Sequence, residues 1–176
     1  MCLEDAVTVG GLTTPPTTEE SLRLLLQARL NVVVSTLALD PPARVQLFGE
    51  LLPFIQRLRS TSGRPYWLIV DEAHYMLPQR AVWPLGFLAN MGAIIVALDF
   101  DQVCPALLEG VDMLVTLGST ARELVQRFAH HTQRTCPAFP AHPPGLEPVC
   151  LWDLHHGEAV VLLEQLQPHQ KHHRHS

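Results

Sequence analysis

The chain has 176 residues, of which 47% are hydrophobic and 16% are charged, and its formal net charge is −5. This composition excludes a chain that is disordered throughout, and the acidic balance argues against nucleic-acid binding through a strongly basic surface. Of the 12 basic residues all but one are arginine, and the exception is Lys171 near the C-terminus. Mechanisms that need a lysine in the folded core are therefore excluded, unless another segment supplies it.

The apolar runs, the N-terminal residues and the cysteines of the sequence all indicate the same cellular compartment. No apolar run approaches the ~18 residues of a membrane-spanning helix. Residues 1–5 are acidic at their end and lack the basic start and apolar centre of a signal peptide. The cysteines are far apart and form no CxxC pair, which argues against a zinc site or a disulfide framework: Cys2, Cys104, Cys136 and Cys150. We therefore expect a cytoplasmic protein without membrane contact.

The first half of the chain alternates strands and helices. Residues 6–9 read as a short strand, and Thr17 and Glu20 have the spacing of a capping box that begins a helix ending near residue 29. Residues 30–37 form a β-branched run suited to a buried strand. A long helix follows over residues 40–62, in which Pro53 predicts a kink or a break. Residues 66–70 are the third predicted strand.

The second half continues this alternation as far as residue 131. We expect a short helix over 83–91, a strand over 93–98, a short helix over 105–109 and a strand over 112–117. Thr120 and Glu123 have the spacing of a second capping box, which opens a helix to about His130. Residues 132–148 read as a proline-rich loop, residues 149–163 as a hairpin, and residues 167–176 as a disordered His-rich tail.

This order of elements predicts an α/β fold. Strands that alternate with helices favour a parallel sheet covered on both faces. We therefore expect a three-layer sandwich with a mostly parallel sheet of about five strands, followed by an antiparallel hairpin at the C-terminal end.

The strongest chemical motif is Trp67 to His74, WLIVDEAH. Four apolar residues form a strand that ends in two carboxylates, at the edge where open α/β sheets bind ligands. In a nucleoside triphosphatase the first carboxylate, here Asp71, helps to hold Mg²⁺, and the second, Glu72, orients and deprotonates the attacking water. His74 is placed to couple the nucleotide state to a neighbouring element. The alternative is a strand that ends in acids for solubility alone.

Two segments resemble P-loop ATPases of the HerA/FtsK type: residues 31–39 (NVVVSTLAL), and residues 51–78, within which this motif lies. The nearest likeness is to a bacterial group associated with a haloacid-dehalogenase-like hydrolase, and it extends over nearly the whole chain. The resemblance implies a RecA-like ATPase domain over residues 1–166 that uses ATP and Mg²⁺. It implies that Asp71 and Glu72 are the Walker B pair, with His74 beside them. In the ATPase interpretation Asp99 and Gln102, at the end of the next strand, would sense the γ-phosphate, and the alternative is a polar strand end at the edge of the sheet.

One departure from this family is large. The sequence contains no GxxxxGK[ST] loop, and this loop and its lysine make most of the contacts to the β- and γ-phosphates. We therefore expect the chain to be the C-terminal portion of such an ATPase, or a degenerate descendant, and to be inactive alone. Its expected partners are a missing N-terminal segment or further copies of the chain. DNA is expected as a partner by family analogy alone.

Three other functions remain open. DEAH helicases require a Ser-Ala-Thr motif after the next strand, where residues 96–99 read Val-Ala-Leu-Asp. Residues 94–103 (IIVALDFDQV) match a haloacid-dehalogenase-like phosphatase, with Asp99 as nucleophile and Asp101 as acid/base, but a core lysine and a downstream acidic pair are missing. The third is a non-catalytic interaction module that retains an ATPase half-fold.

Some conspicuous residues have a simple structural explanation. Arginines that could act as a finger in a ring-shaped oligomer are also plausible solvated helix residues: Arg80, Arg122, Arg127 and Arg134. The tail histidines could bind zinc or nickel, but a polar tail explains them as well: His169, His172, His173 and His175.

Overall fold

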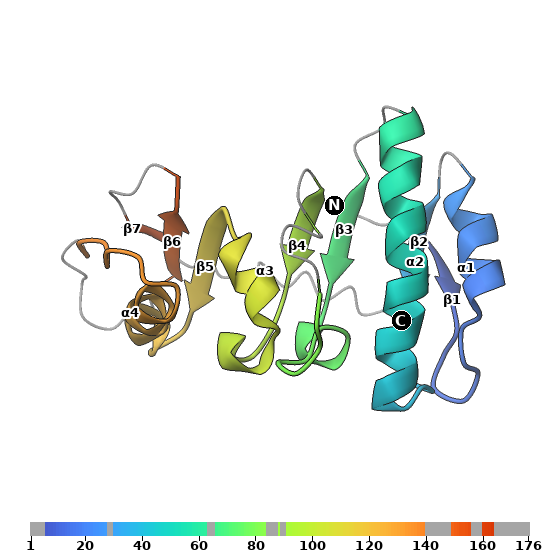
Figure 1. Cartoon of the computed structure of the whole chain (residues 1–176), viewed down its shortest axis with the longest axis horizontal. Helices are drawn as coiled ribbons and strands as arrows, with labels where there is room; N and C mark the ends of the chain where they lie inside the picture. The colour runs from blue at the N-terminus through green and yellow to red at the C-terminus, as the bar shows by residue number, and fades with distance from the viewer. Residues whose placement is uncertain are drawn as a thin grey trace, which may run out of the picture. The chain divides into compact units, whose positions relative to one another are not determined.

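A computed structural model describes residues 6–27, 30–62, 66–83, 88, 91–139, 149–155 and 160–163 (Figure 1). The chain forms two compact units, Met1–Leu107 and Leu108–Ser176, and each is described by itself. In the described residues no helix is long and apolar enough to cross a membrane. The expected tail over residues 167–176 lies outside the described residues, and a single domain over residues 1–166 stays a prediction.

The first unit begins with a strand, a helix and a second strand. β1 (Ala6–Val9) pairs in parallel with β2 (Asn31–Val34), and α1 (Thr18–Leu25) connects them. The capping box predicted at Thr17 is confirmed, because its hydroxyl oxygen accepts a hydrogen bond from the Glu20 N–H at 3.2 Å. The side chain thereby satisfies a backbone donor that the first turn of the helix leaves unpaired.

The loop after β1 is tied to the end of β2. Ser35 N–H donates to the Val9 carbonyl at 2.8 Å, which extends the parallel pairing beyond the strands. Gly10 has φ of +78°, and a Cβ at this position would lie 2.6 Å from the Ser35 carbonyl oxygen. Gly10 is therefore required both by its left-handed backbone and by this close approach. At Gly11 a Cβ would meet no atom within 4 Å.

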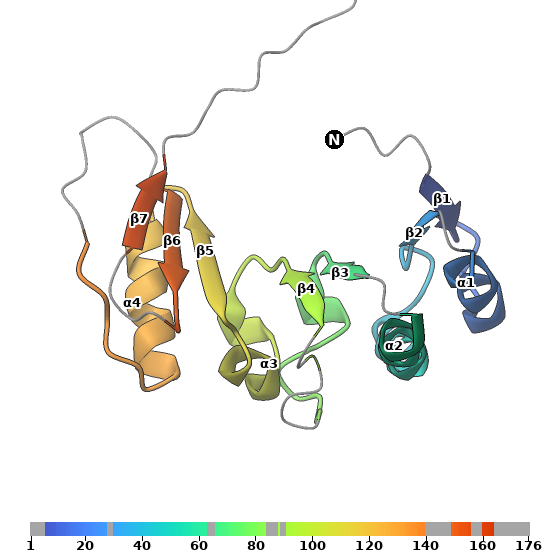
Figure 2. The same cartoon turned by 90° about the horizontal axis from the view of Figure 1, so that it is seen from above.

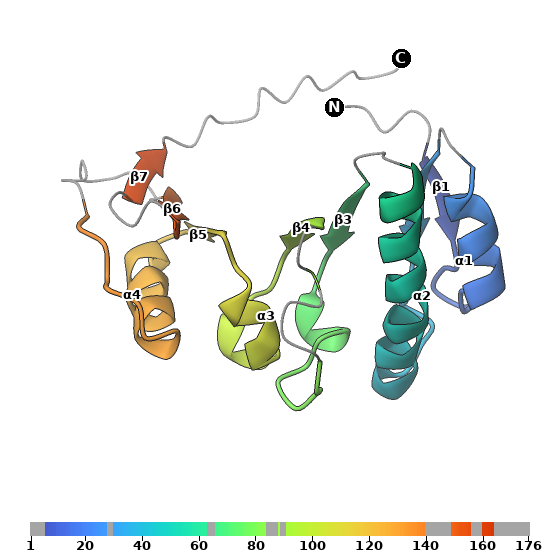
Figure 3. The ribbon, with the colours of Figure 1, turned by 45° about the horizontal axis from the view of Figure 1, so that its top comes forward.

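The longest element is α2 (Pro41–Ser62), which begins where Asp40 accepts a hydrogen bond from Ala43 N–H at 2.9 Å. The break predicted at Pro53 is wrong, because the helix continues through this residue as one element. The Pro53 side chain is exposed, so its ring displaces no core residue on the buried side. α1 and α2 lie side by side (Figure 3), and Thr18 of α1 donates a hydrogen bond to the Glu50 carboxylate. This bond and one from Gln46 lower the pKa of the Glu50 carboxyl.

The second strand pair of this unit contains the motif strand. β3 (Trp67–Val70) and β4 (Gly92–Ile95) are parallel. Two short 3₁₀ turns, η1 (Ala73–Tyr75) and η2 (Phe100–Gln102), follow the two strands, and the helix α3 (Pro105–Glu109) forms as predicted. Much of the helix expected over residues 83–91 lies outside the described residues. Trp83 contacts α2, where its ring lies edge-on to Phe48 at a centroid distance of 5.5 Å.

The second unit is an antiparallel sheet with one helix. β5 (Met113–Leu117) pairs with β6 (Val149–Asp153), which pairs with β7 (Val160–Leu163), and both pairings are antiparallel. α4 (Ala121–His131) lies along this sheet (Figure 2) and contacts β5 and β6. The rings of Phe128 and Trp152 meet edge to face at 6.3 Å and are both buried.

The second predicted capping box is wrong. Thr120 has φ −94° and ψ 5° instead of an extended backbone, and its side chain makes no capping hydrogen bond. The backbone begins the helix instead, since Ala121 N–H donates to the Gly118 carbonyl at 3.0 Å.

The strands of the described residues form three small sheets, β1-β2, β3-β4 and β5-β6-β7. The α/β class, the two parallel pairs and the C-terminal antiparallel hairpin agree with the prediction. A single, mostly parallel five-stranded sheet does not form among the described residues, because β5 takes the antiparallel β6 as its neighbour. The three-layer arrangement is likewise not confirmed.

Candidate functional site

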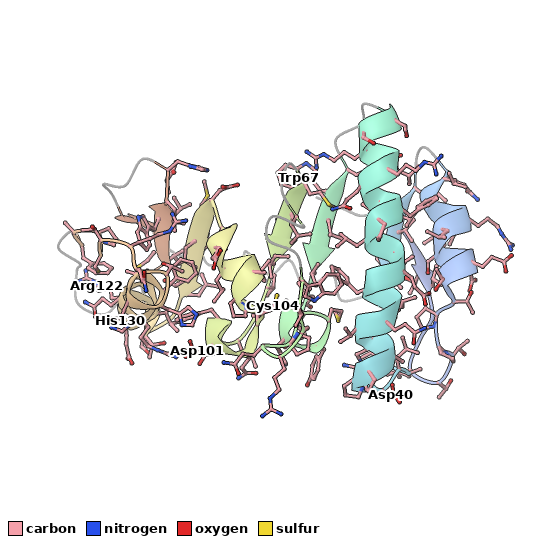
Figure 4. The ribbon with its side chains drawn as sticks, in the orientation of Figure 1. Asp40, Trp67, Asp101, Cys104, Arg122 and His130 are labelled. Atoms are coloured by element: carbon pink, nitrogen blue, oxygen red, sulfur yellow. The ribbon has the colours of Figure 1, made fainter. Side chains whose placement is uncertain are left out.

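The ends of β3 and β4 meet at one edge of the first unit. Val96 N–H donates to the Val70 carbonyl, and Ala73 N–H donates to the Val96 carbonyl, both at 2.9 Å. The carboxylates Asp71 and Glu72 therefore follow β3 directly beside the end of β4. In Figure 4 Trp67 lies at one end of this strand pair, and Asp101 and Cys104 lie toward the other. The carboxyl ends of parallel strands are where open α/β sheets bind ligands.

Glu72 has a strained backbone. Its φ of 49° and ψ of 49° are left-handed, a conformation that costs a residue with a side chain roughly 1–2 kcal/mol. The Asp71 carboxylate accepts a hydrogen bond from Glu72 N–H at 3.0 Å, and the Glu72 carbonyl accepts one from Tyr75 N–H at 3.0 Å. These bonds hold the turn that directs the two side chains. Backbone strain of this kind is concentrated at functional sites.

His74 connects Glu72 to the helix α2. Its Nδ1 is buried and lies 3.5 Å from the Glu72 Oε2, which suits an ion pair when the ring is protonated. Its ring lies 4.2 Å from that of Tyr75, centroid to centroid, and the Arg44 guanidinium of α2 lies 4.7 Å above the Tyr75 ring. Arg44 is itself fixed by donating from Nε to the Leu39 carbonyl at 2.9 Å. The sequence predicted His74 but not this stack, whose members are distant in the chain.

The segment after β4 is held by its own backbone. The Asp99 carboxylate accepts a hydrogen bond from Asp101 N–H at 3.1 Å, and the Asp99 carbonyl accepts one from Gln102 N–H at 3.2 Å. The Gln102 carbonyl accepts a hydrogen bond from Gln79 N–H at 2.9 Å, while the Gln102 side chain is exposed. Asp99 follows β4 by four residues, and its role beside Asp71 and Glu72 stays a prediction.

Sequence reasoning missed a link between the two strand ends. Pro78 and Val103 form an isolated antiparallel bridge, and Cys104 N–H donates to the Leu77 carbonyl at 2.9 Å. Leu77 and Cys104 are fully buried, so the link closes over an apolar centre. Burial also raises the pKa of the Cys104 thiol, which keeps it protonated and unreactive. The apolar pair Leu77 and Val103 was the signal available in the sequence.

Asp71 and Glu72 suit a cation that takes few protein ligands. Across the described parts of the chain, no group of three or more His, Cys, Asp or Glu residues could hold a metal ion. Both carboxylates are exposed at the strand end. Mg²⁺ is usually bound by one or two carboxylates together with waters and the oxygens of a phosphate substrate. The donor set at this edge therefore fits Mg²⁺ that arrives with a nucleotide, and does not fit a cage made by the protein alone.

The remaining predicted residues lie elsewhere. Arg80 is exposed in the first unit. In the second unit the Arg122 guanidinium lies 5.5 Å from the Phe139 ring, and Arg134 approaches the Leu154 carbonyl at 3.5 Å, which are structural contacts. Arg127 also lies in this unit, on α4. The tail histidines lie outside the described residues.

Comparison with known proteins finds solved structures whose fold is similar to that of this chain. No model of a known protein family matches the sequence, and no curated protein matches it. The chain is similar to the genome packaging NTPase B204 from Sulfolobus turreted icosahedral virus 2 in complex with sulfate, with a TM-score of 0.59 and 12% identity over 92% of this chain and 81% of that chain. The complexes of the same NTPase with ATP-gammaS and with AMPPCP each give a TM-score of 0.55 and 11% identity. These cover 91% and 92% of this chain, and 81% and 83% of the viral chain.

The chain has a P-loop NTPase fold. At this level of identity the likeness establishes the fold alone. It agrees with the P-loop ATPase fold that the sequence resemblance implied.

Proposed function

We propose that the chain is the C-terminal portion of a HerA/FtsK-like ATPase and contributes the Walker B half of an ATP site. One observation carries the proposal. In a chain with an NTPase fold, Asp71 and Glu72 follow a parallel strand directly and lie beside the end of the next parallel strand. That is where a triphosphatase needs one carboxylate for its metal and another for water.

The two carboxylates have separate roles in this proposal. Asp71 would hold Mg²⁺, and bound Mg²⁺ neutralises charge on the phosphates. Glu72 would orient the attacking water and accept its proton. Glu72 has a left-handed backbone and its carboxylate lies 3.5 Å from His74 Nδ1, so the two acids have different surroundings. His74 holds the Glu72 carboxylate from one side, and Asp99 and Gln102 would face the γ-phosphate.

The phosphate-binding loop must come from another segment. Lys171 is the only lysine, and it lies outside the described residues. The chain alone should therefore bind Mg-ATP weakly and hydrolyse none. The viral neighbour is a genome packaging NTPase, and by analogy we propose that the intact ATPase acts on DNA in the cytoplasm.

The test begins with the genomic sequence upstream of the Met1 codon. We expect an in-frame strand, a GxxxxGK[ST] loop and a helix there. The protein extended by this segment should hydrolyse ATP with Mg²⁺, and Glu72→Gln should abolish the activity, while Glu109→Gln, an exposed acid on α3, should not. Hydrolysis by the unextended chain that Glu72→Gln abolishes would refute the proposal.

A phosphatase remains the second candidate because Asp99 follows β4 after four residues and begins the turn η2, and an aspartate nucleophile would be needed after such a strand. Trapping of a phospho-aspartate at Asp99 with an aryl phosphate, detected by mass spectrometry, would favour it. The NTPase neighbours and the lack of a downstream acidic pair favour the ATPase.

A further inference from the structure

A series of side-chain contacts joins the first turn of α2 to the turn η1. The Arg44 guanidinium lies 4.7 Å from the centre of the Tyr75 ring, and the Tyr75 ring lies 4.2 Å from that of His74, with 41° between their planes. The Nδ1 of His74 in turn lies 3.5 Å from the Oε2 of Glu72. We call Arg44, Tyr75 and His74 the stack. It connects Glu72 to a helix from an earlier part of the same unit.

The arginine is the fixed end of the stack. Its Nε donates a hydrogen bond to the Leu39 carbonyl at 2.9 Å, and its backbone N–H donates to the Asp40 carbonyl at 3.1 Å. These bonds hold Arg44 against the first turn of α2, and α2 contacts η1. A guanidinium over the face of an aromatic ring is attracted by the negative charge of that face. The position of Tyr75 is therefore tied to the start of α2.

Glu72 is the end of this series that its own surroundings hold least. Its side chain is 49% exposed and its backbone is left-handed, so neither burial nor a regular helix fixes the carboxylate. The Nδ1 of His74, by contrast, is buried and has no hydrogen-bond partner among the described residues. A buried polar nitrogen without a partner is costly, and the Glu72 carboxylate is the anion beside it. A proton on Nδ1 would therefore favour the position that this carboxylate takes.

We propose that Arg44 is a positioning residue for Glu72 and acts on it through Tyr75 and His74. The stack holds the His74 ring with its Nδ1–H directed at Glu72, and this contact selects one orientation of the carboxylate. The contact stands on the geometry of η1 and α2 alone, whereas its role in hydrolysis rests on the proposed function, in which Glu72 orients the attacking water. A displacement of about 1 Å at a reacting group can lower a rate about 100-fold, so the stack would make the start of α2 a determinant of the rate.

The contact is tested in the chain itself, without nucleotide, by NMR at one fixed pH. The nitrogen signals of the His74 ring report which nitrogen carries a proton, and the carboxyl carbon signal of Glu72 reports the surroundings of that group. Tyr75→Leu removes the ring between Arg44 and His74, and we expect loss of the Nδ1–H form and a shift of the Glu72 signal. Tyr75→Phe keeps the ring, and in this variant both signals should stay at their wild-type positions.

Two arginine variants separate the stack from a general effect of charge. Arg44→Gln removes the guanidinium and should shift the same two signals. Arg23→Gln is the matched control, since Arg23 is an exposed arginine on α1 that pairs with Glu19, and it should leave both signals unchanged. Circular dichroism verifies that each variant folds. Unchanged signals in Tyr75→Leu and Arg44→Gln would overturn the proposal even if stability falls, and so would equal shifts in Arg23→Gln.

The role in hydrolysis is tested separately, in the protein extended by its phosphate-binding segment. Arg44→Gln should lower kcat about tenfold and change KM less than about twofold, because the stack acts on the carboxylate that orients water. Arg23→Gln should leave both constants unchanged. Equal activity of wild type and Arg44→Gln would overturn the positioning role. If the extended wild-type protein hydrolyses no ATP, the proposed function fails, and the NMR signals of the chain still decide whether Arg44 acts on Glu72.

Discussion

Two tryptophans on strands show how differently the two units use apolar surface. Trp152 on β6 is 2% exposed and packs against Phe128 of α4, whereas Trp67 on β3 is 68% exposed. Both follow from sequence runs rich in apolar residues. In the second unit the helix α4 packs over the tryptophan, and among the described residues of the first unit no element buries Trp67 in this way. Apolar sequence therefore predicts burial only when the covering element is known.

Replacing each of the two tryptophans with alanine tests this difference in burial most directly. Trp152→Ala should lower the free energy of unfolding by about 3–5 kcal/mol, because it leaves a cavity under α4. Trp67→Ala should lower it by less than about 1 kcal/mol, since little buried surface is lost. Urea denaturation at low protein concentration measures both. Similar losses for the two variants would show that Trp67 is covered within one chain.

Two buried thiols make the units alike in one respect. Burial raises the pKa of Cys104 in the first unit and of Cys150 in the second above the ordinary value of 9.0. The contribution that each protonated thiol makes to the free energy of unfolding is complete below pH 9. It is lost above pH 9, because the unfolded chain then releases protons that the folded chain retains. The free energy of unfolding should fall by up to about 1.4 kcal/mol per pH unit for each thiol.

Stability measured from pH 8 to 10.5 tests this expectation. Cys104→Ala and Cys150→Ala should each flatten the decline, and Cys136→Ala, at an exposed cysteine, should not. An unchanged slope in both buried variants would contradict it.

Left-handed backbone occurs both in the candidate site and at the end of a helix. Glu72 in the first unit and Gln133 after α4 both have positive φ, 49° and 55°. Glycine at either position should raise the free energy of unfolding by up to about 1 kcal/mol by removing the strain. Thermal unfolding of Glu72→Gly and Gln133→Gly measures the gain. If Glu72→Gly is destabilising, the contact of Glu72 with His74 is worth more than the strain.

The smallest contrast concerns the two threonines before helices. Thr17→Ala should cost about 1 kcal/mol, because a capping hydrogen bond is lost. Thr120→Ala should change stability by less than about 0.5 kcal/mol, because its side chain makes no such bond. Chemical denaturation of the two variants side by side gives the difference, and equal costs would show that Thr120 caps its helix in solution.

Sequence patterns of neighbouring residues predicted the elements that depend on interactions between neighbouring residues. The strands at Ala6–Val9 and Met113–Leu117 and the helix start at Asp40 appeared within a residue or so of the expected positions. Thr120 shows the limit, because the same spacing that caps a helix at Thr17 fails where the backbone is not extended. The break predicted at Pro53 is wrong for a related reason, since a helix continues through proline when the rest of its length is held by packing, and the alternative of a kink there stays a prediction.

What the sequence could not predict depends on distant partners. The antiparallel pairing of β5 with β6 joins segments separated by α4 and by residues 132–148 of the sequence. For the site, the sequence predicted that Asp71, Glu72 and Asp99 follow neighbouring strands. It could not predict the left-handed turn at Glu72 or the stack of His74, Tyr75 and Arg44, because these depend on how α2 packs against η1.

The loop after β1 has a consequence for how the sequence can vary. Gly10 combines a φ of +78° with a Cβ position 2.6 Å from the Ser35 carbonyl oxygen, while the position after it is open. In a library of variants selected for folding, glycine should be nearly invariant at position 10, and position 11 should accept most residues. The close approach of β1 to the end of β2 would therefore restrict the amino acid at position 10 alone and leave the next position free to vary.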